Sequence, residues 1–223
     1  MSELRELLER GGAPAEHLDR LTRYGDAVLG ANQRFNLTGA KSAAEFAPHI
    51  LDSLTIVPYV TESLVDIGSG GGLPAIPVAI VAGVPVTMIE TTAKKARFLR
   101  DQLETLDLAG EVVAQRAEAA AHDPQLRERF RTGTARAVAT APTVAELVLP
   151  FLGAGGLAVL QRGALDERER HALSDAALML GGAVEREIPL EGERRIVLVR
   201  KTGVTPARFP RRTGIPEKRP LCY

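Results

Sequence analysis

The sequence predicts an α/β protein in which N-terminal helices precede a doubly wound, mostly parallel sheet. From about Ser63 onward, short apolar segments alternate with amphipathic ones, which favours parallel strands joined by helices. A glycine cluster, Gly68–Gly72, follows the first of these strands, as in sheets that bind a ligand at their carboxyl edge. Near the end, Glu191-Gly192-Glu193 separates two strand-like segments, which indicates a hairpin and therefore an antiparallel edge.

The first 60 residues have a helical pattern rather than an alternating one. Leucine and valine recur there at helical spacing, and Pro14 and Gly30 interrupt the pattern. The apolar positions are Leu4, Leu7, Leu8, Leu18, Leu21 and Val28. We therefore expect an N-terminal helical extension over residues 1–60.

Residues 61–201 are expected to form the main domain, and residues 202–223 a basic tail rich in Pro and Arg. The strands are expected over Leu64–Ile67, Val84–Ile89, Glu111–Gln115, Ala135–Thr140, Leu157–Gln161, Val184–Leu190 and Arg195–Arg200. Helices are expected over Leu73–Ala82 and from an N-cap at Thr92 to about Leu108. The stretch from Arg200 to Pro220 contains seven basic residues and one acid, so the basic excess is concentrated in the tail.

Composition excludes several classes of protein. Twenty-eight basic and 28 acidic residues give a net charge of zero, which excludes a wholly basic nucleic-acid coat but permits a local basic patch. The single cysteine, Cys222, excludes an internal disulfide framework, and no Cys/His spacing suits a zinc site. The longest apolar run, Val78–Ile89, is too short for a membrane span, and the start lacks the apolar core of a signal peptide. We expect a cytoplasmic, metal-free monomer that makes no membrane contact.

The strongest chemical signal is Val65-Asp66-Ile67-Gly68-Ser69-Gly70-Gly71-Gly72, which ends the first expected strand. Glycine permits positive φ and a close backbone approach to a ligand, although a tight strand-to-helix turn would also use it. The dinucleotide fingerprint Gly-x-Gly-x-x-Gly requires a third glycine where this chain has Leu73. The spacing matches Asp-x-Gly-x-Gly-x-Gly instead, the pattern of S-adenosylmethionine (AdoMet) methyltransferases, so AdoMet is the expected cofactor.

Charged residues at the ends of the next strands fit a nucleoside ligand. Glu90 ends the second strand, where a carboxylate can accept hydrogen bonds from ribose hydroxyls or else cap the following helix. After the third strand, the segment Arg116-Ala117-Glu118 lies where an adenine ring is expected, with Ala117 and Glu118 as the contacts and a helix cap as the alternative. Arg136 lies in a small, apolar strand and needs a charged partner, either a ligand carboxylate or a structural ion pair.

Several segments spread over nearly the whole chain carry a more specific resemblance. They are Phe35–Thr38, His49–Ser53, Asp66–Pro77, Lys95–Leu99, Arg136-Ala137 and Pro210–Pro216. Together they resemble the bacterial small-subunit ribosomal RNA guanine-N7 methyltransferases, also called glucose-inhibited division protein B. The resemblance implies a Rossmann-like class I AdoMet-dependent methyltransferase sheet. It also implies methyl transfer from AdoMet to N7 of one guanine in 16S rRNA of the small ribosomal subunit.

Motif and resemblance together assign roles to individual residues. The residues expected to contact the cofactor are Asp66, Gly68, Gly70, Gly72, Leu73, Glu90, Thr91, Thr92, Ala93, Ala117, Glu118 and Arg136. Those expected on the catalytic and substrate side are Asn36, His49, Asp52 and Arg136. Those expected to bind RNA are Arg34, Lys41, Arg162, Arg208, Arg211 and Arg212. Two positions depart from the family pattern, since Arg162 replaces a common Lys and Ala75 a common Gly.

The implied chemistry needs alignment more than proton transfer. Guanine N7 has an in-plane lone pair and no proton to lose, and holding donor and acceptor in line can supply ~7–11 kcal/mol. Because the product is cationic, Asp52 could stabilise the developing charge. The basic tail, with Arg34 and Lys41, is the expected RNA patch, so truncation after Lys201 should weaken RNA binding and spare AdoMet affinity.

Three other functions remain open from the residues alone. A small-molecule methyltransferase would use the N-terminal helices as a lid over the pocket, although the basic tail argues against it. A non-catalytic adaptor would bind AdoMet and RNA without methyl transfer. An NAD-dependent oxidoreductase is disfavoured by Leu73.

Overall fold

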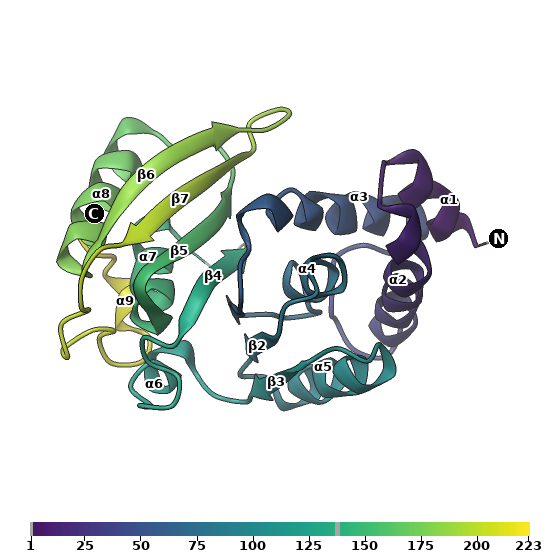
Figure 1. Cartoon of the computed structure of the whole chain (residues 1–223), viewed down its shortest axis with the longest axis horizontal. Coiled ribbons are helices and arrows are strands. Elements are labelled where there is room, and N and C mark those ends of the chain that lie inside the picture. The colour runs from purple at the N-terminus through teal and green to yellow at the C-terminus, as the bar shows by residue number, and fades with distance from the viewer. Residues whose placement is uncertain (1, 137–138) are drawn as a thin grey trace.

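One seven-stranded sheet organises the chain, with strand order β3-β2-β1-β4-β5-β7-β6 in a computed structural model that describes residues 2–136 and 139–223 (Figure 1). The strands are β1 (Leu64–Ile67), β2 (Val86–Ile89), β3 (Gly110–Val113), β4 (Phe130–Arg136), β5 (Leu152–Arg162), β6 (Gly182–Pro189) and β7 (Arg195–Lys201). The first five strands pair in parallel, and β7 pairs antiparallel with both β5 and β6. The predicted parallel sheet with an antiparallel hairpin at its edge is therefore confirmed.

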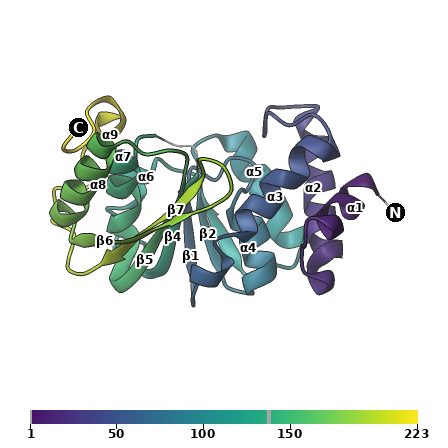
Figure 2. The same cartoon turned by 90° about the horizontal axis from the view of Figure 1, so that it is seen from above.

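Helices cover both faces of the sheet, as Figure 2 shows from above. On one side lie α1 (Glu3–Arg10), α2 (Leu18–Asn32), α3 (Ala43–Leu54), α4 (Ala75–Ala82) and α5 (Ala93–Thr105). On the other lie α6 (Ala117–Ala120), α7 (Ala141–Val148), α8 (Glu167–Met179) and the short α9 (Ile215–Lys218). The strands supply alternate residues to the two layers, so Leu64 packs with the first group of helices and Val65 with the second.

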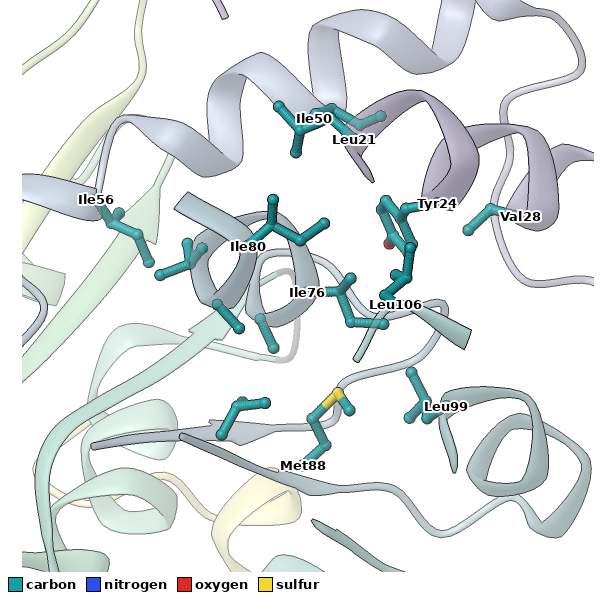
Figure 3. Close-up of a cluster of buried hydrophobic side chains, with 14 of the residues drawn as sticks. Leu21, Tyr24, Val28, Ile50, Ile56, Ile76, Ile80, Met88, Leu99 and Leu106 are labelled. Atoms are coloured by element: carbon teal, nitrogen blue, oxygen red, sulfur yellow. The ribbon is translucent and has the colours of Figure 1, made fainter. Parts of the chain in front are cut away.

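The N-terminal helices share one hydrophobic core with the sheet. Leu21 and Tyr24 of α2 and Ile50 of α3 lie against Ile76 and Ile80 of α4, as Figure 3 shows. Each of these five side chains is almost fully buried. The predicted helices of residues 1–60 are therefore present, and their apolar faces complete the layer that covers β1 and β2.

Two strands begin well before their predicted starts. β4 begins at Phe130, whereas the sequence predicted Ala135 to Thr140, a range that includes residues 137 and 138, which lie outside the described residues. Thr132 and Thr134 make the start of this strand look polar in the sequence. Their side chains are nevertheless buried, because their hydroxyls donate to the carbonyls of Thr61 and Val159. β5 begins at Leu152 because its glycine-rich first half still pairs with β4 through Leu152.

The C-terminal segment, residues 202–223, packs on the domain. Phe209 and Leu221 belong to the core on the α7–α8 side, and α9 lies against α7. The Arg211 guanidinium donates to the fully buried carboxylate of Glu146 on α7, with distances of 2.6 and 2.9 Å for the two shortest bonds. This segment is therefore part of the folded body.

Candidate nucleoside pocket and arginine cleft

The loop between β1 and α4 has a backbone that requires glycine. Gly68, Gly70 and Gly72 have φ of 72°, 57° and 101°, in the left-handed region that other residues rarely adopt. A Cβ on Gly72 would also lie 2.5 Å from Ile76. The loop therefore lies tightly against α4 at the carboxyl end of β1, where sheets of this type bind ligands.

The N-terminal helices hold this loop in place. The hydroxyl of Tyr24 on α2 donates to the carbonyl of Gly71 at 2.9 Å, and Leu37 lies against the same glycine. The Asn32 side chain in turn accepts from the backbone N–H of Leu37 and Thr38, which fixes the segment after α2. Sequence reasoning missed Tyr24 and Asn32, because helical spacing identifies them only as a core position and a helix end.

Glu90 connects the glycine loop to the next helix. Its carboxylate accepts from the backbone N–H of Gly70 at 2.9 Å and of Thr92 at 2.7 Å, and the residue is 6% exposed. Thr92 is the N-cap residue of α5, but its side chain makes no capping hydrogen bond. The Glu90 carboxylate accepts a backbone hydrogen bond at this end of the helix instead. The capping interaction is thus present, and the predicted ribose contact remains a prediction.

Asp66 lies beneath the loop, on β1. Its residue is fully buried, and neither carboxylate oxygen has a hydrogen-bond partner among the described residues. Burial raises the pKa of Asp66 to about 7, against weaker opposing effects of the Ser69 hydroxyl and the Arg136 guanidinium. Asp66 is therefore a buried carboxyl beneath the loop whose ionisation is opposed by its surroundings.

A pocket opens at the carboxyl ends of β1, β2 and β3, and we call it the nucleoside pocket. The predicted residues that line it are Gly68, Glu90, Thr91, Ala117 and Glu118. Arg116, which the sequence placed beside Ala117 and Glu118, also lines it. Sequence reasoning missed the remaining walls, which are Ile67, Ile89, Gln115, Ala139, Thr143, Leu147, Pro216 and Glu217. The other predicted contact residues do not line it, namely Asp66, Gly70, Gly72, Leu73, Thr92, Ala93 and Arg136.

The C-terminal segment supplies one wall of the nucleoside pocket. The backbone N–H of Gly214 donates to the Glu118 carboxylate at 2.8 Å, and the Thr143 hydroxyl donates to the carbonyl of Pro216 at 2.9 Å. Gly214 and Glu118 are 96 residues apart, so no local pattern could join them. Truncation after Lys201 removes this wall, so the predicted sparing of AdoMet affinity would require a cofactor site away from this pocket.

A wider cleft of about 500 Å³ lies next to the nucleoside pocket, and Ala139 lines both. We call it the arginine cleft, and its lining is Asp52, Arg136, Ala139, Gln161, Arg162, Gly163, Leu190, Arg194 and Arg195. Asp52, near the end of α3, accepts from Arg194 at 2.6 Å and from Arg136 at 3.5 Å. The Gln161 amide donates to the Asp52 backbone carbonyl at 2.7 Å. Of the two partners that the sequence allowed for Arg136, a ligand carboxylate or a structural ion pair, the structure shows the ion pair, with Asp52.

The other predicted substrate-side residues are divided between two places. His49, one turn before Asp52, accepts from Arg136 through its backbone carbonyl at 3.3 Å. Burial and the Arg136 charge lower the pKa of the His49 imidazole, which favours its neutral form. Asn36 lines a separate surface depression together with Lys41, and it does not line the arginine cleft.

The residues predicted to bind RNA differ in their surroundings. Arg162 lines the arginine cleft and pairs with Glu169 at 3.1 Å, whereas Arg211 is engaged with Glu146. The others are exposed, namely Arg34, Lys41, Arg208 and Arg212. RNA contact by these residues remains a prediction.

Neither a metal site nor a membrane helix is found in the part of the chain that the structure describes. Over residues 2–136 and 139–223, no three His, Cys, Asp or Glu side chains are grouped to hold a metal ion. Within the same ranges, no helix has the length and apolar character that crossing a membrane requires.

Comparisons with known proteins identify the family of the chain. A family model described as rRNA small subunit methyltransferase G matches residues 17–197. The chain is 37% identical to "Ribosomal RNA small subunit methyltransferase G" of Pelotomaculum thermopropionicum, over 99% of this chain and 100% of the relative. It is 40% identical to the protein of the same name from Chloroflexus aggregans, over 89% of this chain and 88% of the relative.

A solved structure supports the fold independently of sequence identity. It is described as a SAM-dependent methyltransferase from Aquifex aeolicus, and it matches with a TM-score of 0.54 at 13% identity. The match covers 68% of this chain and 90% of that one. With the family match spanning most of the sequence, the chain belongs to the rRNA small subunit methyltransferase G family.

Proposed function

We propose that this protein transfers a methyl group from AdoMet to N7 of a specific guanine in 16S rRNA of the small ribosomal subunit. The observation that carries the proposal is the shared wall at Ala139, which makes the nucleoside pocket and the arginine cleft neighbours. Methyl transfer between two bound molecules requires such adjacent sites. A ribosomal RNA substrate also implies that the enzyme works in the cytoplasm.

The nucleoside pocket has the donor and acceptor set that AdoMet needs. The Glu90 carboxylate lines it as an acceptor for ribose hydroxyls, and Gly68 allows the backbone to approach closely. Ile67, Ile89 and Leu147 give apolar walls that suit an adenine ring. When bound, AdoMet supplies an electrophilic methyl group on a sulfonium. Arg136, at the end of β4 beside the pocket, is the candidate partner for the carboxylate of the cofactor.

On the substrate side, the protein positions the base and does not need to remove a proton. Guanine N7 attacks with its own lone pair, so orientation in the arginine cleft is the main contribution of the protein. Methylation leaves a cationic purine, and the Asp52 carboxylate is the acid within the described lining that can stabilise this charge. His49 and Asn36 are the further candidates for contacts with the nucleotides around the target base.

RNA contact extends beyond the cleft in this proposal. Arg34, Lys41, Arg208 and Arg212 are exposed basic residues and can meet phosphates of the folded RNA. The target base must be accessible or turned out of its stack, because a base stacked inside folded RNA does not expose its reacting atom to a protein cleft.

The test is to incubate the purified protein with labelled AdoMet and small ribosomal subunits from cells that lack this modification. Free 16S rRNA is treated in parallel, and the label is mapped by chain scission at N7-methylguanine. Label at one guanine is the expected result, and the two substrates show which form of the RNA is used. If AdoMet binds but no guanine is labelled, the proposal is wrong and the non-catalytic adaptor is favoured.

A further inference from the structure

The arginine cleft carries an excess of positive charge, because Arg136 and Arg194 share Asp52, while Arg162 and Arg195 pair with Glu169 and Glu187 outside the lining. Four guanidinium groups line it, those of Arg136, Arg162, Arg194 and Arg195, and within the described lining Asp52 is the one acid. Asp52 is shared between two of these arginines. A cleft with this lining favours an anionic group, and arginine binds phosphate in particular through its planar set of N–H donors.

Arg194 forms an ion pair whose guanidinium side is open to solvent. It lies in the exposed turn between β6 and β7, and its side chain is 47% exposed. Figure 2 shows this turn reaching towards α3, where the guanidinium donates to Asp52 at 2.6 Å across 142 residues of sequence. The Asp52 side chain is only 17% exposed, but it has Arg136 as a second partner, so a phosphate that replaces it on Arg194 does not leave the carboxylate unpaired.

The neighbouring arginines form a fixed frame. Arg162 donates to the carbonyl of Ala139 at 2.6 Å and pairs with Glu169, so its side chain is only 14% exposed. Arg195 donates to the carbonyl of Gly163 at 3.0 Å. Two buried atoms in this frame, Nε of Arg162 and Oε1 of Gln161, have no hydrogen-bond partner among residues 2–136 and 139–223. A bound group with both acceptor oxygens and a hydroxyl would satisfy them.

We propose that the arginine cleft binds a backbone phosphate of the target nucleotide, and that Arg194 exchanges Asp52 for this phosphate when RNA enters. Arg162 and Arg195 complete the phosphate site. This inference rests on the proposed function, because it takes the ligand to be the guanosine that is methylated. The Asp52 carboxylate pairs with Arg194 until the phosphate binds, and it then keeps Arg136 as its partner while facing the cationic base.

The first test compares two small ligands that differ only in the phosphate. Guanosine 5′-monophosphate and guanosine are titrated into protein saturated with S-adenosylhomocysteine. The wild type should bind the monophosphate more tightly than the nucleoside. Arg194→Ala should weaken monophosphate binding about tenfold and leave guanosine binding unchanged, since it removes one charged hydrogen bond. The matched control is Arg200→Ala, because Arg200 lies on β7 and pairs with Glu185 away from the cleft.

Asp52→Asn separates this proposal from a purely structural ion pair. If Asp52 competes with phosphate for Arg194, the variant should bind the monophosphate more tightly, opposite in sign to Arg194→Ala. If the two variants weaken binding alike, or if neither changes it, the proposal is wrong. Arg194→Lys should retain part of the affinity because it keeps the charge and loses the paired N–H geometry.

An RNA titration identifies the source of the phosphate. For 16S rRNA, Arg194→Ala should lower the slope of log affinity against log salt by about one, as expected for the loss of one phosphate contact. An unchanged slope, with monophosphate binding still affected, would mean that the ligand is a free nucleotide, and the RNA assignment would be wrong. If monophosphate binding behaves as expected but no 16S rRNA is methylated, the proposed function fails while the phosphate site stands.

Discussion

At the residue scale, folding makes it less favourable for the Asp66 carboxyl to ionise. Its carboxyl is buried without a partner among the described residues, and burial raises its pKa to about 7 from 3.8. When the pKa is higher in the folded chain than in the unfolded chain, protonation favours folding. The contribution of Asp66 to stability is therefore fully present below pH 3.8 and is lost as the pH rises through about 7.

Asp66→Asn should remove this dependence. Between the two pKa values, the stability of the wild type relative to the variant should fall by up to about 1.4 kcal/mol per pH unit. The difference between the two urea unfolding free energies is measured at pH 4, 6 and 8, so that other titrating groups cancel. Asp101→Asn, on the exposed side of α5, is the control. A difference that is constant with pH would show that Asp66 is ionised throughout.

Tyr24 is the second residue with a specific prediction. Tyr24→Phe keeps the ring in the core and removes the hydroxyl, which leaves the carbonyl of Gly71 without this hydrogen bond. We expect a loss of about 1–2 kcal/mol in unfolding free energy, because a buried acceptor loses its partner. AdoMet affinity, measured by calorimetry, should also fall, since the glycine loop becomes less restrained. Tyr59→Phe, at a partly buried position in the turn after α3, should change neither quantity.

At the scale of elements, one ion pair joins the C-terminal segment to α7. Glu146 on α7 is fully buried, and Arg211 is its partner through both carboxylate oxygens. Arg211→Ala leaves this carboxylate buried and unpaired, so we expect a loss of about 3 kcal/mol in urea unfolding. Its neighbour Arg212 is exposed, and Arg212→Ala should change stability by less than about 0.5 kcal/mol.

Measuring RNA binding by the same two variants distinguishes a residue that stabilises the fold from one that contacts RNA. Arg212→Ala should weaken 16S rRNA binding at unchanged stability, as the sequence predicted for an exposed basic residue. If Arg211→Ala keeps the stability of the wild type and loses only RNA binding, the ion pair with Glu146 is not what holds the segment in place. The sequence alone could not show that Arg211 is a structural residue and Arg212 an exposed one, because Arg211 and its partner Glu146 lie 65 residues apart.

At the scale of the whole molecule, features encoded over a few residues were predictable from the sequence. The limits of β1 match the prediction, and the glycine spacing marked the loop after it, because both depend on neighbours in the chain. The wall that Pro216 gives to the nucleoside pocket was not predictable. The ion pair between Arg194 and Asp52 was not predictable either, since tertiary packing brings these two residues together. The start of β4 was mispredicted for a related reason, because carbonyls distant in sequence accept the hydrogen bonds of its buried threonine hydroxyls.

The shared core gives the last prediction, which concerns the N-terminal helices as a unit. A chain of residues 61–223 should fail to fold, because it exposes Ile76 and Ile80 where Leu21, Tyr24 and Ile50 covered them. Its near-ultraviolet circular dichroism and its urea transition should be lost. As a control, the full chain is cut at a protease site engineered at the exposed Gly39, and its two fragments should stay associated. A cooperative transition in the shortened chain would show instead that these helices are a separable addition to an autonomous domain.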